Sequence, residues 1–160
     1  MTGELFLRHS TNKLTQMTSY IEACLLRLDS DQIWARGHGA QNSIGNLVLH
    51  LCGNVRQWIG WSIGGEADVR ERDLEFAASS RMDTAELLSK LNSTIGGALA
   101  ILENFPLDRL TERVRTQDGE RFALEVIYQV VGHFQQHTGQ IMSATKLITG
   151  EDLKFYKKSS

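Results

Sequence analysis

The 160-residue sequence is poor in several residue types, and each shortage excludes a class of protein. One proline and two cysteines exclude a proline-rich linker and a disulfide-bonded scaffold. No apolar run reaches the roughly 20 residues that span a bilayer, and no N-terminal segment has the pattern of a signal peptide. The net charge of −2 lacks the basic excess of nucleic-acid-binding domains. We therefore expect a cytoplasmic protein without a membrane or nucleic-acid partner.

The composition that remains is that of one folded domain. Hydrophobic residues make up 41% of the chain and charged residues 22%, which is ordinary for a globular protein. The length suits a single domain with a sizeable core, and no linker or internal repeat divides residues 1–160. Cys24 and Cys52 lie in amphipathic segments without a partner at metal or redox spacing. We expect both to be buried thiols.

Four long segments repeat apolar residues every three or four positions, the period of an amphipathic helix. We expect helices over residues 4–28, from residues 42–43 to the glycines at 64–65, over 83–106 and over 123–149. Asn42 and Ser43 are candidate N-caps, and Asp83 with Glu86 has the spacing of a capping box. The only proline ends the third helix, and Gly150 is well placed to end the fourth.

Little strand signal competes with these helices. Residues 113–116 and 120–122 flank a Gln-Asp-Gly turn and predict a brief hairpin. The connection over residues 65–82 is long enough to travel the length of a bundle, which lets the second and third helices run parallel. The sequence therefore predicts an all-α four-helix bundle that is not a simple up-down-up-down bundle.

Three of the five histidines occupy positions where the helical period calls for core residues: His50 in the second helix, and His133 and His137 in the fourth. Residues four apart lie on one helical face, so His133 and His137 can reach one ion, and His50 from a facing helix can complete a three-histidine site. His9 and His38 have no such spacing. The histidine pattern predicts a divalent metal site.

Two interpretations of this pattern stay open. The three histidines can be metal ligands, or they can be hydrogen-bonded core residues, because an unsatisfied buried polar group costs ~1–3 kcal/mol. Amides flank them: Asn54 and Gln57 follow His50, and Gln140 follows His137 by three positions. Asn54 and Gln140 are candidates to orient the imidazoles or hold a bound water, whereas Gln57 is as readily a surface amide.

The order of four segments resembles the DinB/YfiT-like superfamily, in its uncharacterised DinB-like branch. They read NSIGNLVLHLCGNVRQWI, RERDLEFA, VVGHFQQHTGQI and TKLITGEDLKFY, and the resemblance covers nearly the whole chain. It implies a left-handed four-helix bundle with up-down-down-up topology. It also implies one divalent metal, usually zinc or nickel, and its ligands correspond to His50, His133 and His137.

The expected chemistry has several alternatives. Three neutral imidazoles leave an ion its full charge, which can lower the pKa of a bound water or bind a thiol as thiolate. Enzymes of the superfamily that this sequence resembles include transferases and isomerases that use low-molecular-weight thiols such as bacillithiol or mycothiol. Other members are described as hydrolases. No Asp or Glu lies within a helical turn of a histidine, which favours thiol transfer. A non-catalytic metal-binding bundle is the third alternative.

The charged connection also allows more than one role. Arg70 and Arg72 can bind a substrate carboxylate, or a carboxylate of this segment can act as a base, although a solvated charged loop is the simpler interpretation. Trp58 and Trp61 suit a pocket or a subunit interface. We expect a small-molecule substrate and, from the resemblance, a homodimer.

Overall fold

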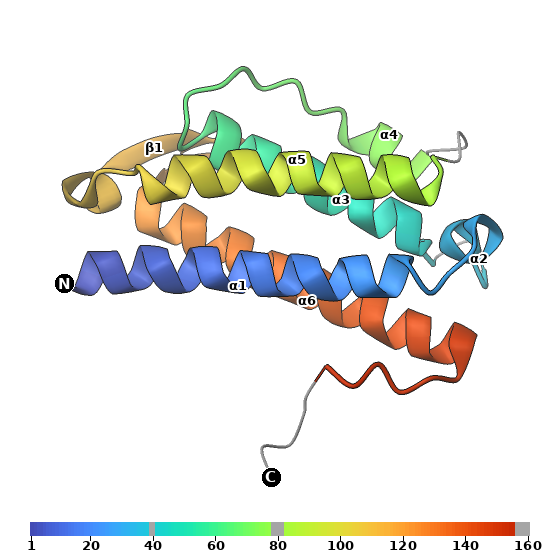
Figure 1. Cartoon of the computed structure of the whole chain (residues 1–160). Helices are drawn as coiled ribbons and strands as arrows, with labels where there is room; N and C mark the ends of the chain where they lie inside the picture. Colours follow the sequence, from blue (N-terminus) through green and yellow to red (C-terminus); the bar gives the residue numbers. More distant parts are fainter. Residues whose placement is uncertain (39–40, 78–81, 156–160) are drawn as a thin grey trace, which may run out of the picture.

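Four long helices dominate the computed structural model, which describes residues 1–38, 41–77 and 82–155 (Figure 1). They are α1 (Thr2–Leu25), α3 (Ile44–Val55), α5 (Thr84–Glu103) and α6 (Ala123–Thr149). A π-helical segment, η1 (Arg56–Trp61), follows α3 without a break and prolongs it. The prediction of a mainly helical domain is confirmed.

Short elements fill the connections. They are α2 (Ser30–Trp34), α4 (Arg72–Ala77) and the 3-10 helix η2 (Leu107–Thr111). The predicted hairpin is present as β1 (Arg113–Thr116) and β2 (Gly119–Phe122), paired antiparallel with Arg113 opposite Phe122. Gly119, with φ of +107°, provides the turn conformation that other residues rarely adopt.

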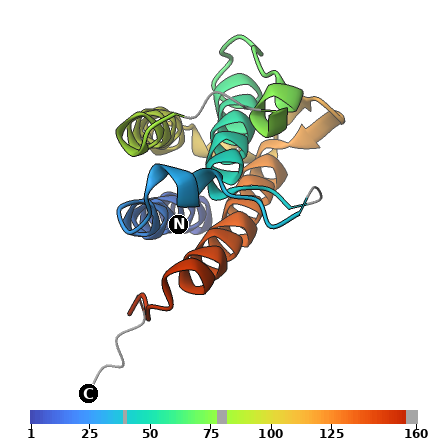
Figure 2. The same ribbon diagram turned by 90° about the vertical axis from the view of Figure 1, so that its right-hand side faces the viewer.

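Each of the helices α1 and α3 packs against both α5 and α6, and α3 also packs against the segment that precedes α5. In Figure 1, α3 and α5 both begin at the end of the bundle where α2 lies, so the connection between them runs back along the molecule. Within this connection α4 packs on α3, as the end-on view shows (Figure 2).

Local sequence signals set most helix ends. Ser43 caps α3 by accepting a hydrogen bond from the Asn46 amide, and Asp83 and Glu86 form the predicted capping box of α5. Gly150, with φ of +71°, ends α6. The predicted end of the first helix was wrong: α1 stops at Leu25, because Asp29 caps the separate helix α2.

The buried stripe of α6 differs from the predicted one. It passes through Phe134 and Thr138, whereas His133 and His137 are only half-buried beside it. Thr138 satisfies its hydroxyl by donating to the Phe134 carbonyl, so a polar residue is tolerated in the core. The two histidines therefore lie at the edge of the core.

Cys24 and Cys52 are both buried free thiols, as expected, and burial raises the pKa of each. None of the helices in the described residues is both long and apolar enough to cross a membrane.

Candidate metal centre

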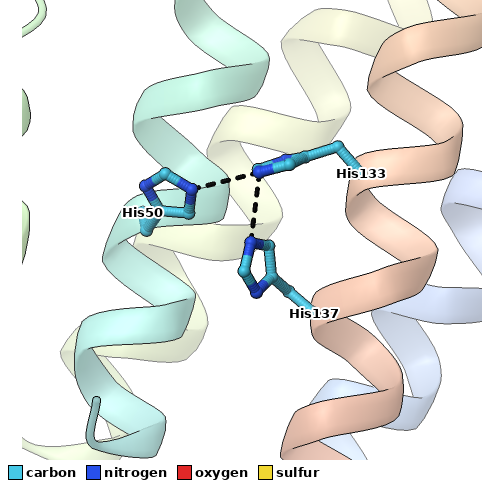
Figure 3. A group of neighbouring side chains, drawn as sticks. All are labelled: His50, His133 and His137. Carbon is cyan, nitrogen blue, oxygen red and sulfur yellow. Dashed lines mark hydrogen bonds between the residues drawn. The ribbon is translucent and has the colours of Figure 1, made fainter. Parts of the chain in front are cut away.

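Three imidazoles from two helices converge beside the core (Figure 3). His50 projects from α3, and His133 and His137 project from successive turns of α6. The Nε2 atom of His133 lies 3.1 Å from Nε2 of His50 and 3.1 Å from Nε2 of His137. One ligand atom from each histidine lies within 4.8 Å of the other two. The spacing of the histidines in the sequence thus predicts which side chains meet.

Hydrogen bonds fix the tautomers of two of the rings. His50 donates through Nδ1 to Oε2 of Glu75 at 3.0 Å, and His137 donates through Nδ1 to Oε1 of Gln140 at 2.7 Å. A neutral imidazole carries one N–H, so the Nε2 atoms of both rings present lone pairs. Both lone pairs face the Nε2 atom of His133.

Hydrogen bonds among the three rings cannot satisfy both of these lone pairs, whereas a cation between the rings can. A single N–H on His133 can serve only one of the two facing lone pairs, and its Nδ1 atom is buried without a hydrogen-bond partner in the described residues. Nitrogens bound to one zinc ion at about 2.0–2.1 Å with tetrahedral angles lie about 3.3 Å apart. Two of the three separations, at 3.1 Å each, are close to this spacing, and the ligand atoms of all three histidines lie within 4.8 Å of one another, so the donor set fits a divalent ion.

The local electrostatics keep the α6 histidines neutral. Burial, together with the neighbouring His137 and His50, lowers the pKa of His133 to about 4. Burial also lowers the pKa of His137, although the hydrogen bond to Gln140 opposes the change. Imidazoles must be neutral to bind a metal, so both are in the ligating form at neutral pH.

Glu75 is the site residue that sequence reasoning missed. It lies in α4, and Arg70 clamps its carboxylate with two hydrogen bonds, Nε to Oε1 at 2.8 Å and Nη2 to Oε2 at 2.9 Å. Burial would raise the pKa of Glu75, but hydrogen bonds from Arg70 and His50 lower it overall. The expectation of a solvated loop is therefore wrong for this pair: their side chains are only 5% and 10% exposed.

Further polar groups hold Arg70 in place. Its Nη1 donates to Oε1 of Gln57 at 2.9 Å, and the Gln57 amide donates to Asp68 at 3.0 Å. Gln57 is buried, so its interpretation as a surface amide is wrong. Asp68, Gln57, Arg70, Glu75 and His50 thus form one chain of hydrogen bonds that ends at the imidazole.

A glycine makes room for this chain. A Cβ atom on Gly53 would overlap Oε1 of Glu75 and would lie 3.2 Å from Nε of Arg70. Any side chain at this position would displace the carboxylate. Gly53 lies three residues after His50, so the same face of α3 carries the imidazole and the space for its partner.

Of the other predicted site residues, some contact the histidine cluster and some do not. Gln140 contacts His137 as described, whereas Asn54 is half-buried and its side chain makes no hydrogen bond to any described residue. Arg72 lies with its guanidinium 5.5 Å from the centre of the Phe76 ring, and that ring lies 4.8 Å from the His50 ring. Its charge contributes to the lowered pKa of His133, which places a cation near the histidine cluster.

Comparison with known families identifies the family of this chain. The family model described as "Protein of unknown function (DUF1572)" matches residues 1–157. The chain belongs to the DUF1572 family. DUF1572 is a DinB/YfiT-like family, so the resemblance seen in the sequence is confirmed. None of the curated proteins matches this DUF1572 protein significantly.

Among solved structures, this DUF1572 protein is similar to one titled "Crystal structure of the mycothiol-dependent maleylpyruvate isomerase". The TM-score is 0.66 at 16% sequence identity. The similarity covers 84% of this chain but only 60% of the isomerase chain. It shows a shared fold, and the chain spans about 60% of the length of the isomerase that it matches.

Proposed function

We propose that this protein binds one divalent metal ion, zinc or nickel, through His50, His133 and His137, and that it is a transferase that uses a low-molecular-weight thiol. The observation that carries the proposal is the convergence of three Nε2 atoms, two of them fixed as lone-pair donors by Glu75 and Gln140. The similarity in fold to a mycothiol-dependent isomerase supports the choice of thiol chemistry.

The protein residues hold and orient the ion. When bound, a divalent ion supplies positive charge that lowers the pKa of a thiol or water attached to it. The three imidazoles are neutral ligands and leave that charge undiminished, while Glu75 and Gln140 fix the rings that point toward it. Because Glu75 is itself neutralised by Arg70, the carboxylate can orient His50 without adding a net negative charge to the centre.

The position of Glu75 favours a transferase over a hydrolase. A hydrolase of this kind needs a carboxylate that can accept a proton from water near the ion. Glu75 contacts Nδ1 of His50, the opposite side of the ring from Nε2, and Arg70 occupies its oxygens. In the described residues the metal-ligating group contains three histidines and no carboxylate. A thiol needs no such base, because its own pKa is already near 8.5.

The position of Arg72 supports the proposal that the substrate carries an anionic group. Its side chain makes no ion pair with the described residues, and its charge acts on His133. Arg70, the other arginine considered from the sequence, is committed to Glu75. We therefore assign binding of the substrate anion to Arg72 and expect Arg72→Gln to raise KM while metal content stays unchanged.

Cobalt substitution tests the proposal directly. Protein loaded with Co²⁺ should change its visible absorption when cysteine, glutathione, bacillithiol or mycothiol is added, because a sulfur ligand gives a charge-transfer band. The His133→Ala variant should show no such change. A screen of electrophiles with the responsive thiol, followed by thiol consumption, then identifies the reaction.

Two outcomes would reject thiol transfer. If no thiol changes the cobalt spectrum but the metal-loaded protein hydrolyses an ester or amide, the hydrolase alternative is correct. If neither occurs and metal is still bound through the three histidines, the protein is a non-catalytic metal-binding bundle.

Four further parts of the proposal concern topology, location, assembly and substrate, and the family resemblance supports the topology and the assembly. We propose a left-handed bundle in up-down-down-up order, to which the helix directions in Figure 1 conform. We also propose that the protein works in the cytoplasm as a homodimer on a small-molecule substrate. Sedimentation equilibrium checks the dimer, and a monomer at concentrations well above those in the cell would contradict it.

A further inference from the structure

One side of the longest helix, α6, is not covered by the rest of the described chain. α1 and α3 both pack against α6, and in the end-on view α1 lies to the left of α6 and α3 lies above it (Figure 2). The residues on the opposite side of the helix are exposed. Six of them form what we call the outer face of α6: Glu125, Tyr128, Gly132, Gly139, Ser143 and Lys146.

The outer face lacks the charge that a solvent-facing helix surface usually carries. α6 has 27 residues, and Glu125 and Lys146 are its only Asp, Glu, Lys or Arg side chains. The shorter helix α1 has four: Glu4, Arg8, Lys13 and Glu22. Tyr128 is 71% exposed, although it is a large aromatic residue. Protein interfaces are depleted of charge at their centre and enriched in tyrosine, so the outer face has the composition of an interface.

Two glycines lie at the centre of the outer face. Gly132 and Gly139 are seven residues apart, so they lie two turns apart on nearly the same line of the helix. Glycine inside a helix is less favourable than alanine, and a Cβ at either position would meet no atom within 4 Å. Packing within the described chain therefore does not require these glycines. A helix surface without Cβ atoms lets a second backbone approach closely.

The outer face is also complementary to itself. Glu125, Gly132, Gly139 and Lys146 recur every seven residues, and the midpoint of this series lies between residues 135 and 136. When two copies of α6 lie antiparallel with these midpoints level, Gly132 of each copy lies beside Gly139 of the other, and Glu125 lies beside Lys146. A two-fold contact between identical chains requires this symmetry under reversal, whereas a contact with an unrelated partner does not.

The charges at the two ends of the outer face are available for such a contact. Lys146 is exposed and makes no ion pair with any residue that the structure describes. Glu125 accepts a hydrogen bond from the Phe122 amide through Oε2 at 3.0 Å, which leaves Oε1 for a cation. No ion pair within the described chain would have to break when a second copy binds.

We propose that the outer face of α6 is the interface of a two-fold symmetric homodimer, in which α6 packs antiparallel against α6 of a second copy. The glycines let the two backbones approach at the centre, and the pairs of Glu125 with Lys146 fix the register at both ends. The inference rests on the homodimer of the proposed function and adds its surface. It does not depend on the metal centre, because His133 follows Gly132 directly and successive residues of a helix point roughly 100° apart.

Leucine substitution of the glycines tests the close approach. Gly132→Leu and Gly139→Leu should each raise the dissociation constant of the dimer at least about tenfold, because the added side chains force the two backbones apart. Sedimentation equilibrium of the full chain measures this constant. Gly97→Leu, at an exposed glycine of α5 where a Cβ also meets no atom within 4 Å, is the matched control and should leave it unchanged. Leucine is a better helix former than glycine, so a weaker helix cannot explain a lost dimer.

Exchange of the two charges tests the register. Glu125→Lys and Lys146→Glu each place like charges side by side at both ends of the contact, and each should weaken the dimer roughly three- to tenfold at low salt. The Glu125→Lys/Lys146→Glu double variant restores opposite charges and should regain most of the lost affinity. Helix stability cannot produce this recovery, because both substitutions oppose the helix dipole. Circular dichroism melting checks that each variant is folded.

The proposed interface is wrong if Gly132→Leu and Gly139→Leu dimerise as tightly as Gly97→Leu, or if the double charge variant binds no more tightly than the single ones. The dimer then uses another surface. A monomeric unaltered protein would overturn both this interface and the homodimer itself. Metal content, measured on the same samples, should not change with the state of association, so these outcomes are distinguishable from a failure of the histidine centre.

Discussion

At the scale of single residues, the centre depends on which nitrogen of each imidazole carries the proton. Glu75 and Gln140 accept from Nδ1 of His50 and His137 and thereby turn both Nε2 lone pairs inward. His133 has no such partner for its Nδ1 in the described residues. Hydrogen bonds orient two of the three candidate ligands and not the third. The three histidines should therefore contribute unequally to metal affinity.

Alanine substitution of the three histidines is the first prediction. His50→Ala, His133→Ala and His137→Ala should each reduce metal content from about one ion per chain to a small fraction, because two imidazoles bind a divalent ion much more weakly than three. Elemental analysis of protein purified without a histidine tag measures this. His9→Ala and His38→Ala are the controls and should retain full occupancy. Normal metal content in the His133→Ala and His137→Ala variants would refute the ligand assignment.

Glu75→Gln is the second prediction. The amide keeps the volume and one acceptor but loses the charge that Arg70 and His50 share, so zinc affinity should fall about 10–100-fold, as is usual for a group that orients a ligand. Competition with a chromophoric chelator measures the affinity. Glu71→Gln, four residues earlier and exposed, is the matched control. Equal affinities of the two variants would show that Glu75 does not support the site.

The third prediction concerns pH and the metal-free protein. The unfolded chain binds a proton at His133 near pH 6.5, whereas the folded protein binds it only near pH 4. The unfolded state therefore holds more protons between these values, so this histidine makes stability fall as the pH falls from about 6.5 to about 4. Urea unfolding at several pH values measures the slope, and His133→Gln should make it shallower. An unchanged slope in that variant would contradict the lowered pKa.

The sequence predicts the three histidines but not the residue that orients one of them. A spacing of four on a helix is a local signal, and it needs no knowledge of packing. Glu75 lies 25 positions from His50, in a charged segment with no helical period long enough to assign a face. The one local hint was Gly53, a helix-weakening residue one turn from His50, whose role becomes clear only from the packing of α4.

At the scale of elements, the contact between α3 and α4 connects the fold to the site. α4 has only six residues, too few to be a stable helix alone, so the buried Glu75 and its hydrogen bonds to α3 hold it in place. Asn46 of α3 donates to the Glu75 carbonyl at 2.9 Å, which adds a backbone contact to the side-chain one. The geometry of the site therefore depends on a helix–helix contact that one methyl group can disrupt.

Gly53→Ala is the fourth prediction, paired with Gly96→Ala. At Gly53 the new Cβ would clash with the Glu75 carboxylate, so both zinc affinity and stability should fall, the latter by ~1–3 kcal/mol. At Gly96, within α5, a Cβ meets no atom within 4 Å, and alanine should stabilise the protein by roughly 0.5–1 kcal/mol. Urea unfolding and zinc competition separate the two effects. A stabilising Gly53→Ala would mean that α4 does not pack as described.

Sequence patterns locate the long helices well, but they do not reveal where a helix departs from regular α-helical geometry. The prediction of α5 and α6 is close, because caps and a terminal glycine mark their ends. The π-helical turn Arg56–Trp61 was not predicted. One such turn shifts the apolar stripe by a single residue, which a short run of Trp, Ile and Gly does not reveal. Gln57, at the start of this turn, holds Arg70.

At the scale of the whole molecule, the apolar core is continuous and does not include the histidine centre. It is built from all four long helices, with fully buried residues such as Leu14, Leu51, Leu91 and Phe134. The centre lies where α3 and α6 meet at the edge of this core. Folding therefore depends chiefly on apolar burial, and a metal ion bound at the histidines would add to a structure that already exists.

Removal of the metal is the fifth prediction, and it follows from this separation. An ion that binds only the folded state adds ~2.7 kcal/mol at 100 times its dissociation constant, and each kcal/mol changes Tm by about 2–4 °C in a protein of this size. Chelation should therefore lower Tm by roughly 5–11 °C while the far-ultraviolet dichroism at 25 °C stays helical. The Leu91→Ala variant, which removes a fully buried side chain far from any ligand in the sequence, should lower Tm equally with and without chelator. Loss of helical signal on chelation alone would mean that the ion, and not the apolar core, holds the four helices together.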